Sequence, residues 1–173
     1  AFVKEAWHIL EPGTPLIWNW HLTAICEHLE AITFGTFLKL GFQNRLLINV
    51  PPGTMKSMAT GVFWPAWEWG ALNQPAMRFI GASHEEGLAT RDAVRMRRLV
   101  QSDWFQERWP LAMVGDQNAK TYFENASTGW RQSCPVRSMT GRRGDRVTWD
   151  DPHSVEDAHS DARLEEANRI FRE

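Results

Sequence analysis

The stretch from Leu46 to Met58, which reads L-L-I-N-V-P-P-G-T-M-K-S-M, restricts the fold of this chain more than any other. Residues Arg45–Val50 form a nearly continuous apolar run, which is typical of a strand that is buried on both faces. Pro51 and Pro52 end that run because neither has an N–H group to donate to a neighbouring strand. The residues that follow predict a tight turn and then a helix that begins near Lys56.

A strand, a turn and a helix that starts with Lys56-Ser57 are the layout of a phosphate-binding loop. The standard pattern is G-x-x-x-x-G-K-[ST], and its two glycine positions are held here by Val50 and Met55. Gly53 can adopt a positive φ, and the free N–H groups at the start of a helix favour an anion. An ordinary strand–turn–helix with a surface lysine explains these residues equally well.

In the phosphate-loop interpretation, each side chain has a chemical role. The Lys56 ammonium would reach the β and γ phosphates of ATP, and the Ser57 hydroxyl would ligate Mg²⁺. The residues predicted to surround the nucleotide are Pro52, Gly53, Thr54, Met55, Lys56, Ser57 and Met58.

A second stretch, Arg146–Asp151, favours the nucleotide interpretation. It reads R-V-T-W-D-D, a short run of residues that prefer strands and that ends in two carboxylates. In P-loop nucleotidases a neighbouring strand ends in an acid that holds Mg²⁺, and a further acid can orient and deprotonate the attacking water. Successive residues of a strand point to opposite sides, so we expect different roles for Asp150 and Asp151. The alternative is an acidic strand end that caps a helix starting near Ser154.

Composition excludes several other classes of protein. The 173 residues are 43% hydrophobic and 23% charged with a net charge of −2, as expected for one globular domain that does not attract DNA over its whole surface. No apolar run approaches the roughly 18 residues of a membrane span. Cys26 and Cys134 have neither metal-binding nor redox spacing, so we expect two buried thiols.

The remaining pattern predicts alternating helices and strands. We expect an α/β fold, a P-loop NTPase, whose mostly parallel sheet is flanked by helices and carries the ligand at the carboxyl ends of its strands. Residues 1–173 would form a single domain, with a helical lead-in over 1–44 and a nucleotide-binding core over 45–173. Helices are predicted at 2–10, 22–32, 57–70 (with a kink near Gly61–Pro65), 84–101 and 155–172, and further strands at 77–83, 120–124 and 129–134, the last two as a hairpin. In the second helix Leu22, Ile25, Leu29 and Ile32 follow helical spacing, and Asn19 is a candidate N-cap. Phe63, Trp64 and Trp67 are predicted to pack against the sheet.

Two other groups of side chains admit more than one interpretation. His21 and His28 lie seven residues apart on about one helix face, and without an evident third ligand they are predicted to be structural. Arg91, Arg95 and Arg98 share a helix face that either contacts phosphates, DNA or a neighbouring subunit, or is simply solvated.

Five segments in order resemble the large terminase subunit of tailed bacteriophages. They are N-W-H-L-T-A-I-C-E-H-L-E-A-I, L-L-I-N-V-P-P-G-T-M-K-S, F-W-P-A-W-E-W-G, R-D-A-V-R-M-R-R-L-V-Q-S-D-W-F and T-G-R-R-G-D-R-V-T-W-D-D-P-H, and together they span most of the chain. The family is similar in using a phosphate loop that departs from the usual glycines.

The resemblance implies the ATPase half of a DNA-packaging motor, an ATP hydrolase that drives double-stranded DNA into a procapsid. It implies a ring of identical subunits at the capsid, with the portal protein and the small terminase subunit as partners, no membrane, and the cytoplasm of an infected or prophage-carrying bacterium. Residues Gly53–Ser57 would be the phosphate loop with Lys56 as a catalytic residue. Asp150 would hold Mg²⁺, and Asp151 falls where the family has its catalytic carboxylate, often Glu.

Arg142 and Arg143 are predicted candidates for an arginine finger. They precede the strand that ends in the acids, and five residues of strand span roughly 17 Å, which would keep them from the γ-phosphate of their own subunit. They would instead reach a neighbour's ATP in a ring. A basic loop without that role is the alternative, and Arg91 is a further candidate.

The resemblance also implies segments that this sequence does not contain. Family members continue after the acid pair into further strands and a nuclease domain, so we expect a fold that is incomplete at its C-terminus and has no nuclease activity. The competing hypotheses are another P-loop ATPase that acts on nucleic acid, such as a helicase core, and a fragment that binds nucleotide or assembles without hydrolysis.

Overall fold

A mixed five-stranded sheet forms the centre of the described residues, which are 1–154 and 159–172 of this computed structural model. The strand order is β2-β3-β4-β1-β5. β1 pairs in parallel with both β4 and β5, whereas the β2–β3 and β3–β4 pairs are antiparallel. The strands are β1 (Phe79–Ser83), β2 (Met113–Asn118), β3 (Tyr122–Asn125), β4 (Trp130–Pro135) and β5 (Arg146–Trp149).

The sheet is less parallel than predicted. Two of the four pairings are antiparallel because the predicted hairpin, β3–β4, is joined by a further strand, β2, that the sequence pattern did not reveal. The parallel part consists of β1 and its two neighbours, and every residue of β1 is buried. The α/β class is therefore confirmed, and the mostly parallel sheet is not.

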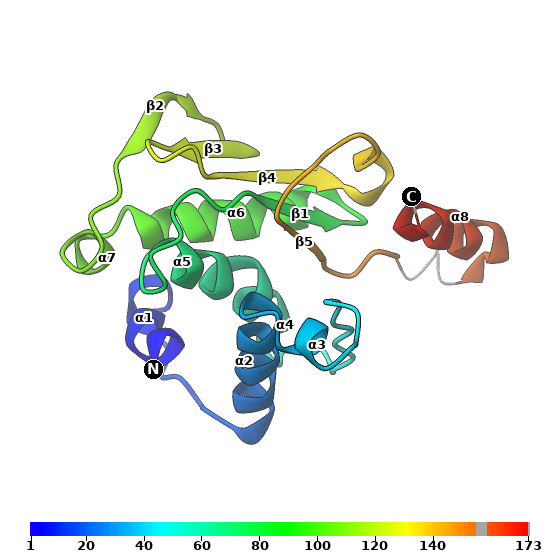
Figure 1. The fold of residues 1–173 in the computed structure, drawn as a ribbon, viewed down its shortest axis with the longest axis horizontal. Helices are drawn as coiled ribbons and strands as arrows, with labels where there is room; N and C mark the ends of the chain where they lie inside the picture. The colour runs from blue at the N-terminus through cyan, green and yellow to red at the C-terminus, as the bar shows by residue number, and fades with distance from the viewer. Residues whose placement is uncertain (155–158, 173) are drawn as a thin grey trace.

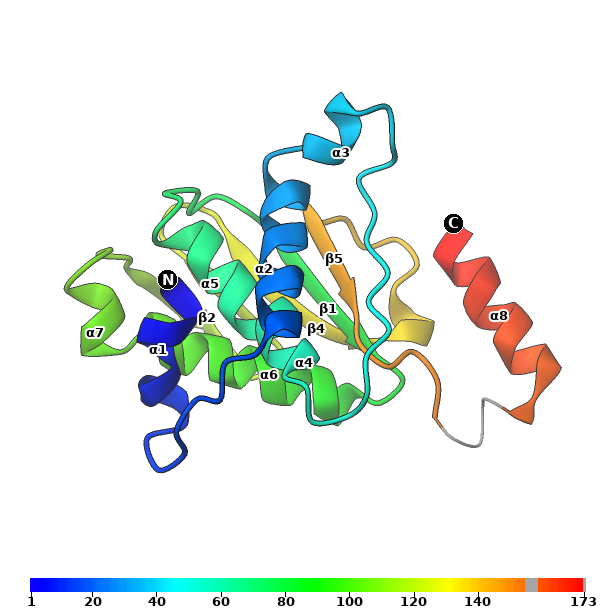
Figure 2. The same cartoon turned by 90° about the horizontal axis from the view of Figure 1, so that it is seen from below.

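The helices lie mainly on one side of the sheet, with α6 and α5 beneath the strands and α1 and α2 farther out (Figure 1). α8 lies at the end of the molecule near the carboxyl ends of the parallel strands (Figures 1 and 2). The helices are α1 (Phe2–Leu10), α2 (Trp20–Thr33), α3 (Thr36–Lys39), α4 (Lys56–Met58), α5 (Trp64–Trp69), α6 (Glu86–Val100), α7 (Asp103–Gln106) and α8 (Asp161–Arg172).

The main hydrophobic core fills the space between the sheet and these helices. Phe79 of β1 and Phe123 of β3 pack there against Phe63, Met96 and Leu99. A smaller cluster on the opposite face of the sheet contains Ile80 and Ala82 of β1 with Cys134, and Ile170 of α8 packs against it. β1 is therefore covered on both faces, as a parallel strand requires.

The predicted strand Arg45–Val50 is wrong, since the structure shows an extended segment there without strand pairing. Leu46 and Ile48 are half-buried in the cluster formed by α2 and Trp64, while Leu47 is 92% exposed. The segment thus alternates between buried and exposed residues. Leu46 and Ile48 are covered by packing against α2 and Trp64, so these side chains do not require a place in the sheet.

The helix predicted at 57–70 forms with an irregular centre. α4 continues into a π-helical segment, Ala59–Phe63, which continues into α5. Pro65 lies in the first turn of α5, where its missing N–H is tolerated. The irregularity therefore falls where the kink near Gly61–Pro65 was predicted. Of the predicted sheet-facing aromatics, Phe63 joins the main core, but Trp64 and Trp67 pack against α2 instead.

α2 follows its predicted pattern closely. The Asn19 side chain accepts a hydrogen bond from the N–H of Trp20 at 2.7 Å, as expected of an N-cap. The four predicted apolar positions, Leu22, Ile25, Leu29 and Ile32, are the buried residues of the helix. His28 Nδ1 donates to the carbonyl of Ala24 at 2.7 Å, in line with a structural histidine. The described residues contain no group of three or more potential metal ligands of the His, Cys, Asp and Glu types.

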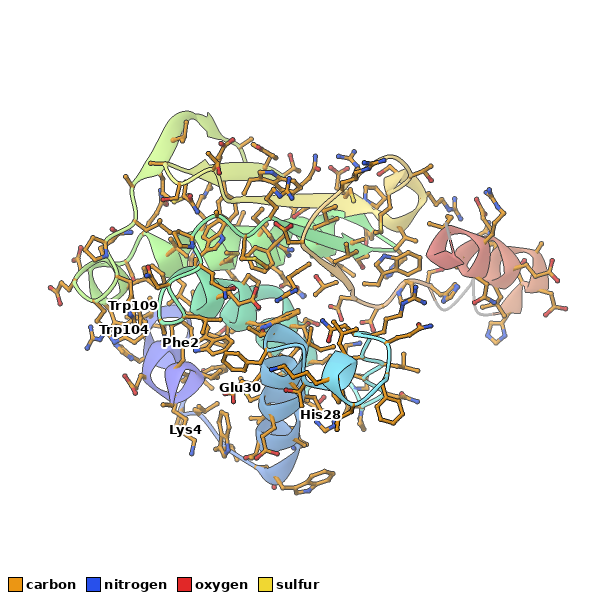
Figure 3. All side chains as sticks on the ribbon, viewed as in Figure 1. Phe2, Lys4, His28, Glu30, Trp104 and Trp109 are labelled. Carbon is orange, nitrogen blue, oxygen red and sulfur yellow. The ribbon has the colours of Figure 1, made fainter. Side chains whose placement is uncertain are left out.

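Several of the ten tryptophans close the packing between α1 and α7. Phe2 of α1 contacts Trp104 and Trp109, with ring centroids 5.8 and 5.6 Å apart (Figure 3). Trp104 also lies beneath the guanidinium of Arg108.

Among the described helices, none is long and apolar enough to cross a membrane. The start of the helix predicted at 155–172 falls on 155–158, outside the described residues.

A buried ion pair joins α5 to the start of β5. Glu68 is fully buried, and its Oε1 atom accepts hydrogen bonds from Nε and Nη2 of Arg146 at 3.2 and 3.1 Å. Thr33 at the end of α2 donates to the same oxygen at 2.6 Å and accepts from Trp64 Nε1. This network connects α2, α5 and the strand that leads to the two acids.

We predict that Arg146→Met lowers the free energy of unfolding by roughly 3–5 kcal/mol, because it leaves the Glu68 carboxylate buried without a counter-ion. The double variant Glu68→Met with Arg146→Met should lose less, since it removes both charges. Urea denaturation of the wild type and the two variants measures this. Equal losses in the single and double variants would contradict it.

Candidate functional site

The turn before α4 is compact and contains two residues in the left-handed conformation. Thr54 Oγ1 donates to the carbonyl of Pro51 at 2.7 Å, which closes the turn. Gly53 and Met55 both have positive φ, 79° and 63°, and Met55 is the N-cap residue of α4. Glycine adopts this conformation freely, but a residue with a Cβ pays roughly 1–2 kcal/mol for it. Met55, which stands where the standard pattern has glycine, therefore adopts a glycine-like backbone.

Lys56 lies against both predicted acids. Its Nζ atom is 2.5 Å from Asp151 Oδ1 and 3.2 Å from Asp150 Oδ1, although 95 residues separate Lys56 from Asp151 along the chain. Burial lowers the pKa of the Lys56 ammonium, but the hydrogen bond to Asp151 and the charge of Asp150 outweigh it, so the pKa lies above its usual range. Lys56 is therefore a cation held at the end of β5.

Pairing with β1 fixes the backbone at the two acids. The N–H of Asp150 donates to the carbonyl of Ala82 at 2.8 Å, so the strand-like path continues past β5. The carbonyl of Asp151 accepts from both the backbone N–H and Nδ1 of His84, at 3.2 and 2.8 Å. Asp151 has φ 46°, which turns the chain away from the sheet.

The two carboxylates have different surroundings. The Asp150 side chain is 19% exposed and lines a small cavity together with Ser57. The Asp151 side chain is 59% exposed. Asp150 thus faces the interior beside the predicted metal-binding hydroxyl, while Asp151 faces solvent.

The donors present fit Mg²⁺. The ion prefers oxygen ligands and is commonly held by one or two carboxylates, a substrate phosphate and water. Ser57 and Asp150 supply a hydroxyl and a carboxylate on one cavity, and Lys56 shows that a positive charge is accommodated beside the same carboxylate. Further protein ligands are not required for such a site.

The predicted basic face of α6 is largely engaged in contacts within the chain. Arg91 Nε donates to Asp92 at 2.8 Å, and Arg95 pairs with Glu11 at 3.3 Å. The hydrogen bond to Asp92 raises the pKa of Arg91, and the charges of Asp150 and Asp151 add to the effect. Arg91 therefore lies within electrostatic range of the acids, and both Arg91 and Arg98 are exposed.

Arg142 and Arg143 are exposed and lie in the loop before β5, at the opposite end of that strand from Asp150. Arg142 Nε donates to the carbonyl of Ser138 at 2.8 Å. Neither arginine is brought to Lys56 and the acids, which agrees with the distance argument from the sequence.

Arg131 of β4 is a site residue that the sequence analysis missed. It is 2% exposed and lines the same cavity as Ser57 and Asp150. The alternation of β4 could have revealed it, because Arg131 and Ser133 occupy the inward positions that usually hold apolar residues.

Comparison of this chain with protein-family models, with curated proteins and with solved structures finds no match.

We predict that Met55→Gly is more stable than Met55→Ala by about 1 kcal/mol, because glycine relieves the positive φ while both variants lose the same side-chain contacts. Thermal unfolding of both variants measures the difference. Met58 is the control: with φ −64° it should show the reverse order, with Met58→Ala more stable than Met58→Gly. The same order at both positions would contradict the left-handed conformation of Met55.

Proposed function

We propose that this chain is a P-loop ATPase, and more specifically the ATPase part of a large terminase subunit of a tailed bacteriophage. The observation that carries the proposal is the contact of Lys56 with Asp150 and Asp151. A lysine at the start of a helix, after a turn with two positive φ values, meets two carboxylates at the end of β5. These are the parts that phosphoryl transfer needs.

In this proposal the ATP phosphates lie over the turn and the start of α4. The N–H groups from Gly53 to Ser57 and the Lys56 ammonium would bind the β and γ phosphates, and Ser57 and Asp150 would hold Mg²⁺. Bound Mg²⁺ would neutralise charge that develops on the phosphate oxygens. Asp151, which is more exposed, would orient the attacking water and accept its proton.

Nucleotide binding would require Lys56 to exchange partners. In the structure its ammonium is bound by the two carboxylates, so the charge that would meet the phosphates is already neutralised. A bound γ-phosphate would compete with Asp151 for the ammonium, and Mg²⁺ would replace it beside Asp150. Asp151 is then released as ATP binds, at the moment when a general base is needed.

The terminase assignment depends on the sequence segments that resemble that family. Under this assignment the substrates are ATP and double-stranded DNA, and the chain works in a ring beside the portal protein and the small terminase subunit in the cytoplasm of a bacterial host. The exposed position of Arg142 and Arg143 away from the acids suits a role toward a neighbour's ATP.

We expect Lys56→Ala to reduce phosphate release from Mg²⁺-ATP by roughly 10²–10³-fold, as for loss of one strong electrostatic contact to the transition state. Steady-state phosphate assays on the purified chain measure this. Lys39→Ala, which removes an exposed lysine of α3, is the matched control and should keep wild-type activity. Undiminished release by Lys56→Ala would refute the site.

Asp151→Asn should bind ATP at least as tightly as the wild type, because Lys56 loses a competing partner, yet hydrolyse it roughly 10²–10⁴-fold more slowly. Titration with a fluorescent ATP analogue and a phosphate assay separate the two effects. Asp150→Asn is the contrast, since losing a metal ligand should weaken Mg²⁺-dependent binding. Weaker binding in Asp151→Asn would instead assign that residue to the metal.

A further inference from the structure

A small cavity lies directly behind the phosphate loop, between the π-helical segment, α6 and the helix-facing side of the sheet. It has about 10 Å³ of space for the centre of a water molecule, which is room for a single water. Its polar lining comes from separate elements of the chain: Ser57, Thr60, Asp92, Arg131, Thr148 and Asp150.

The Arg131 guanidinium is buried at this cavity with unused donors. The residue is 2% exposed, and its Nε and Nη1 atoms have no hydrogen-bond partner. Burial lowers the pKa of Arg131 to about 10, so the group stays charged at neutral pH. Buried donors without partners cost roughly 1–3 kcal/mol each, and more when charged. A buried charged donor at a polar cavity therefore indicates an acceptor in that cavity.

Gly81 of β1 makes space for this guanidinium. A Cβ atom on Gly81 would lie 2.2 Å from Arg131 Nη2, so any side chain there would displace the guanidinium. A Cβ atom on Gly61 would make only ordinary van der Waals contacts, 3.8 Å from the same nitrogen and 3.6 Å from Asp92. Glycine inside a strand often marks such a close approach. The missing side chain at Gly81 of β1 therefore leaves the space that the Arg131 guanidinium occupies.

Neither carboxylate at the cavity accepts a hydrogen bond from Nε or Nη1 of Arg131. Asp92 is buried, but its Oδ1 atom accepts from Arg91 at 2.8 Å, so its charge is shared between two arginines. Asp150, which also lines the cavity, is bound to Lys56. A water molecule in the cavity can accept from Arg131 and donate to a carboxylate, which satisfies both groups.

We propose that Arg131 is a positioning residue of the nucleotide site, acting through one buried water on the Asp150 carboxylate. The inference rests on the proposed ATPase function. By fixing the rotation of that carboxylate, the water would hold it ready for Mg²⁺ beside Ser57. Partners of this kind orient metal ligands, and their loss typically costs roughly 10- to 100-fold in metal affinity.

The first test is a high-resolution crystal structure of the chain without nucleotide or metal. We expect one ordered water within hydrogen-bond distance of Arg131 and of Asp150. A cavity that contains no water, or a water that contacts only one of the two residues, would overturn the proposal. This measurement does not depend on catalysis.

The second test is the Mg²⁺ concentration that half-saturates binding of a fluorescent ATP analogue. Arg131→Met should raise it roughly 10- to 100-fold. Gly81→Ala should raise this Mg²⁺ concentration too, because the new methyl group displaces the guanidinium. Arg131→Lys keeps a charged donor and should therefore recover part of the Mg²⁺ affinity that Arg131→Met loses. Circular dichroism confirms folding, and the lysine and alanine variants carry the test if Arg131→Met is unfolded.

Val100→Ala is the matched control, since it removes fully buried core volume at the far end of α6 without reaching the cavity. It should lower stability and leave the Mg²⁺ dependence unchanged. Wild-type protein that binds no nucleotide would refute the proposed function. Wild-type protein that binds nucleotide, with an unchanged Mg²⁺ dependence in the Arg131 and Gly81 variants, would refute only the role of Arg131.

Discussion

The parallel pairing of β5 with β1 is the constraint on which the rest of the site depends. β1 is buried along its whole length, so its register with both neighbours is fixed by the core on either face. That register extends beyond β5, because the N–H of Asp150 still bonds to the carbonyl of Ala82. The pairing of β5 with β1 therefore sets the positions of Asp150 and Asp151. Lys56 reaches them because α4 packs, through Met58, on the helix-covered face of the sheet.

Much of this arrangement could be predicted from local patterns. The apolar spacing of α2 and its Asn19 cap, the β3–β4 hairpin and the strand before Asp150 are all encoded within short windows. Short-range patterns determine these elements because a helix stripe or a tight turn involves neighbours in sequence. That the loop and the acids share one site was likewise expected, but for a reason that holds only for the acids: they follow β5, whereas the run before the loop is not a strand of the sheet.

The features that could not be predicted depend on partners far away in the chain. The run Arg45–Val50 has a strand's composition, but its Leu46 and Ile48 pack against α2, and nothing within the run reveals that neighbour. β2 has no clear alternation of its own and gains its pairing from β3. Arg131 lies in a correctly predicted strand, yet its importance depends on Gly81 in β1 and on a cavity formed by elements from four other parts of the sequence.

The π-helical segment Ala59–Phe63 carries a consequence for how insertions and deletions affect this chain. It lies between Lys56, at the start of the helix, and Glu68, whose buried pair with Arg146 anchors β5. Each residue of a regular helix turns its side chain by about 100° around the axis. A turn with i→i+5 hydrogen bonds holds one more residue than an α-helical turn, so deletion of one residue here, with a return to a regular α-helix, would leave the loop and the buried pair nearly in register. Deletion of one residue from α5 would instead rotate one end by about 100° against the other. The π-helical segment is therefore the place in this helix where a change of one residue in length is best accommodated.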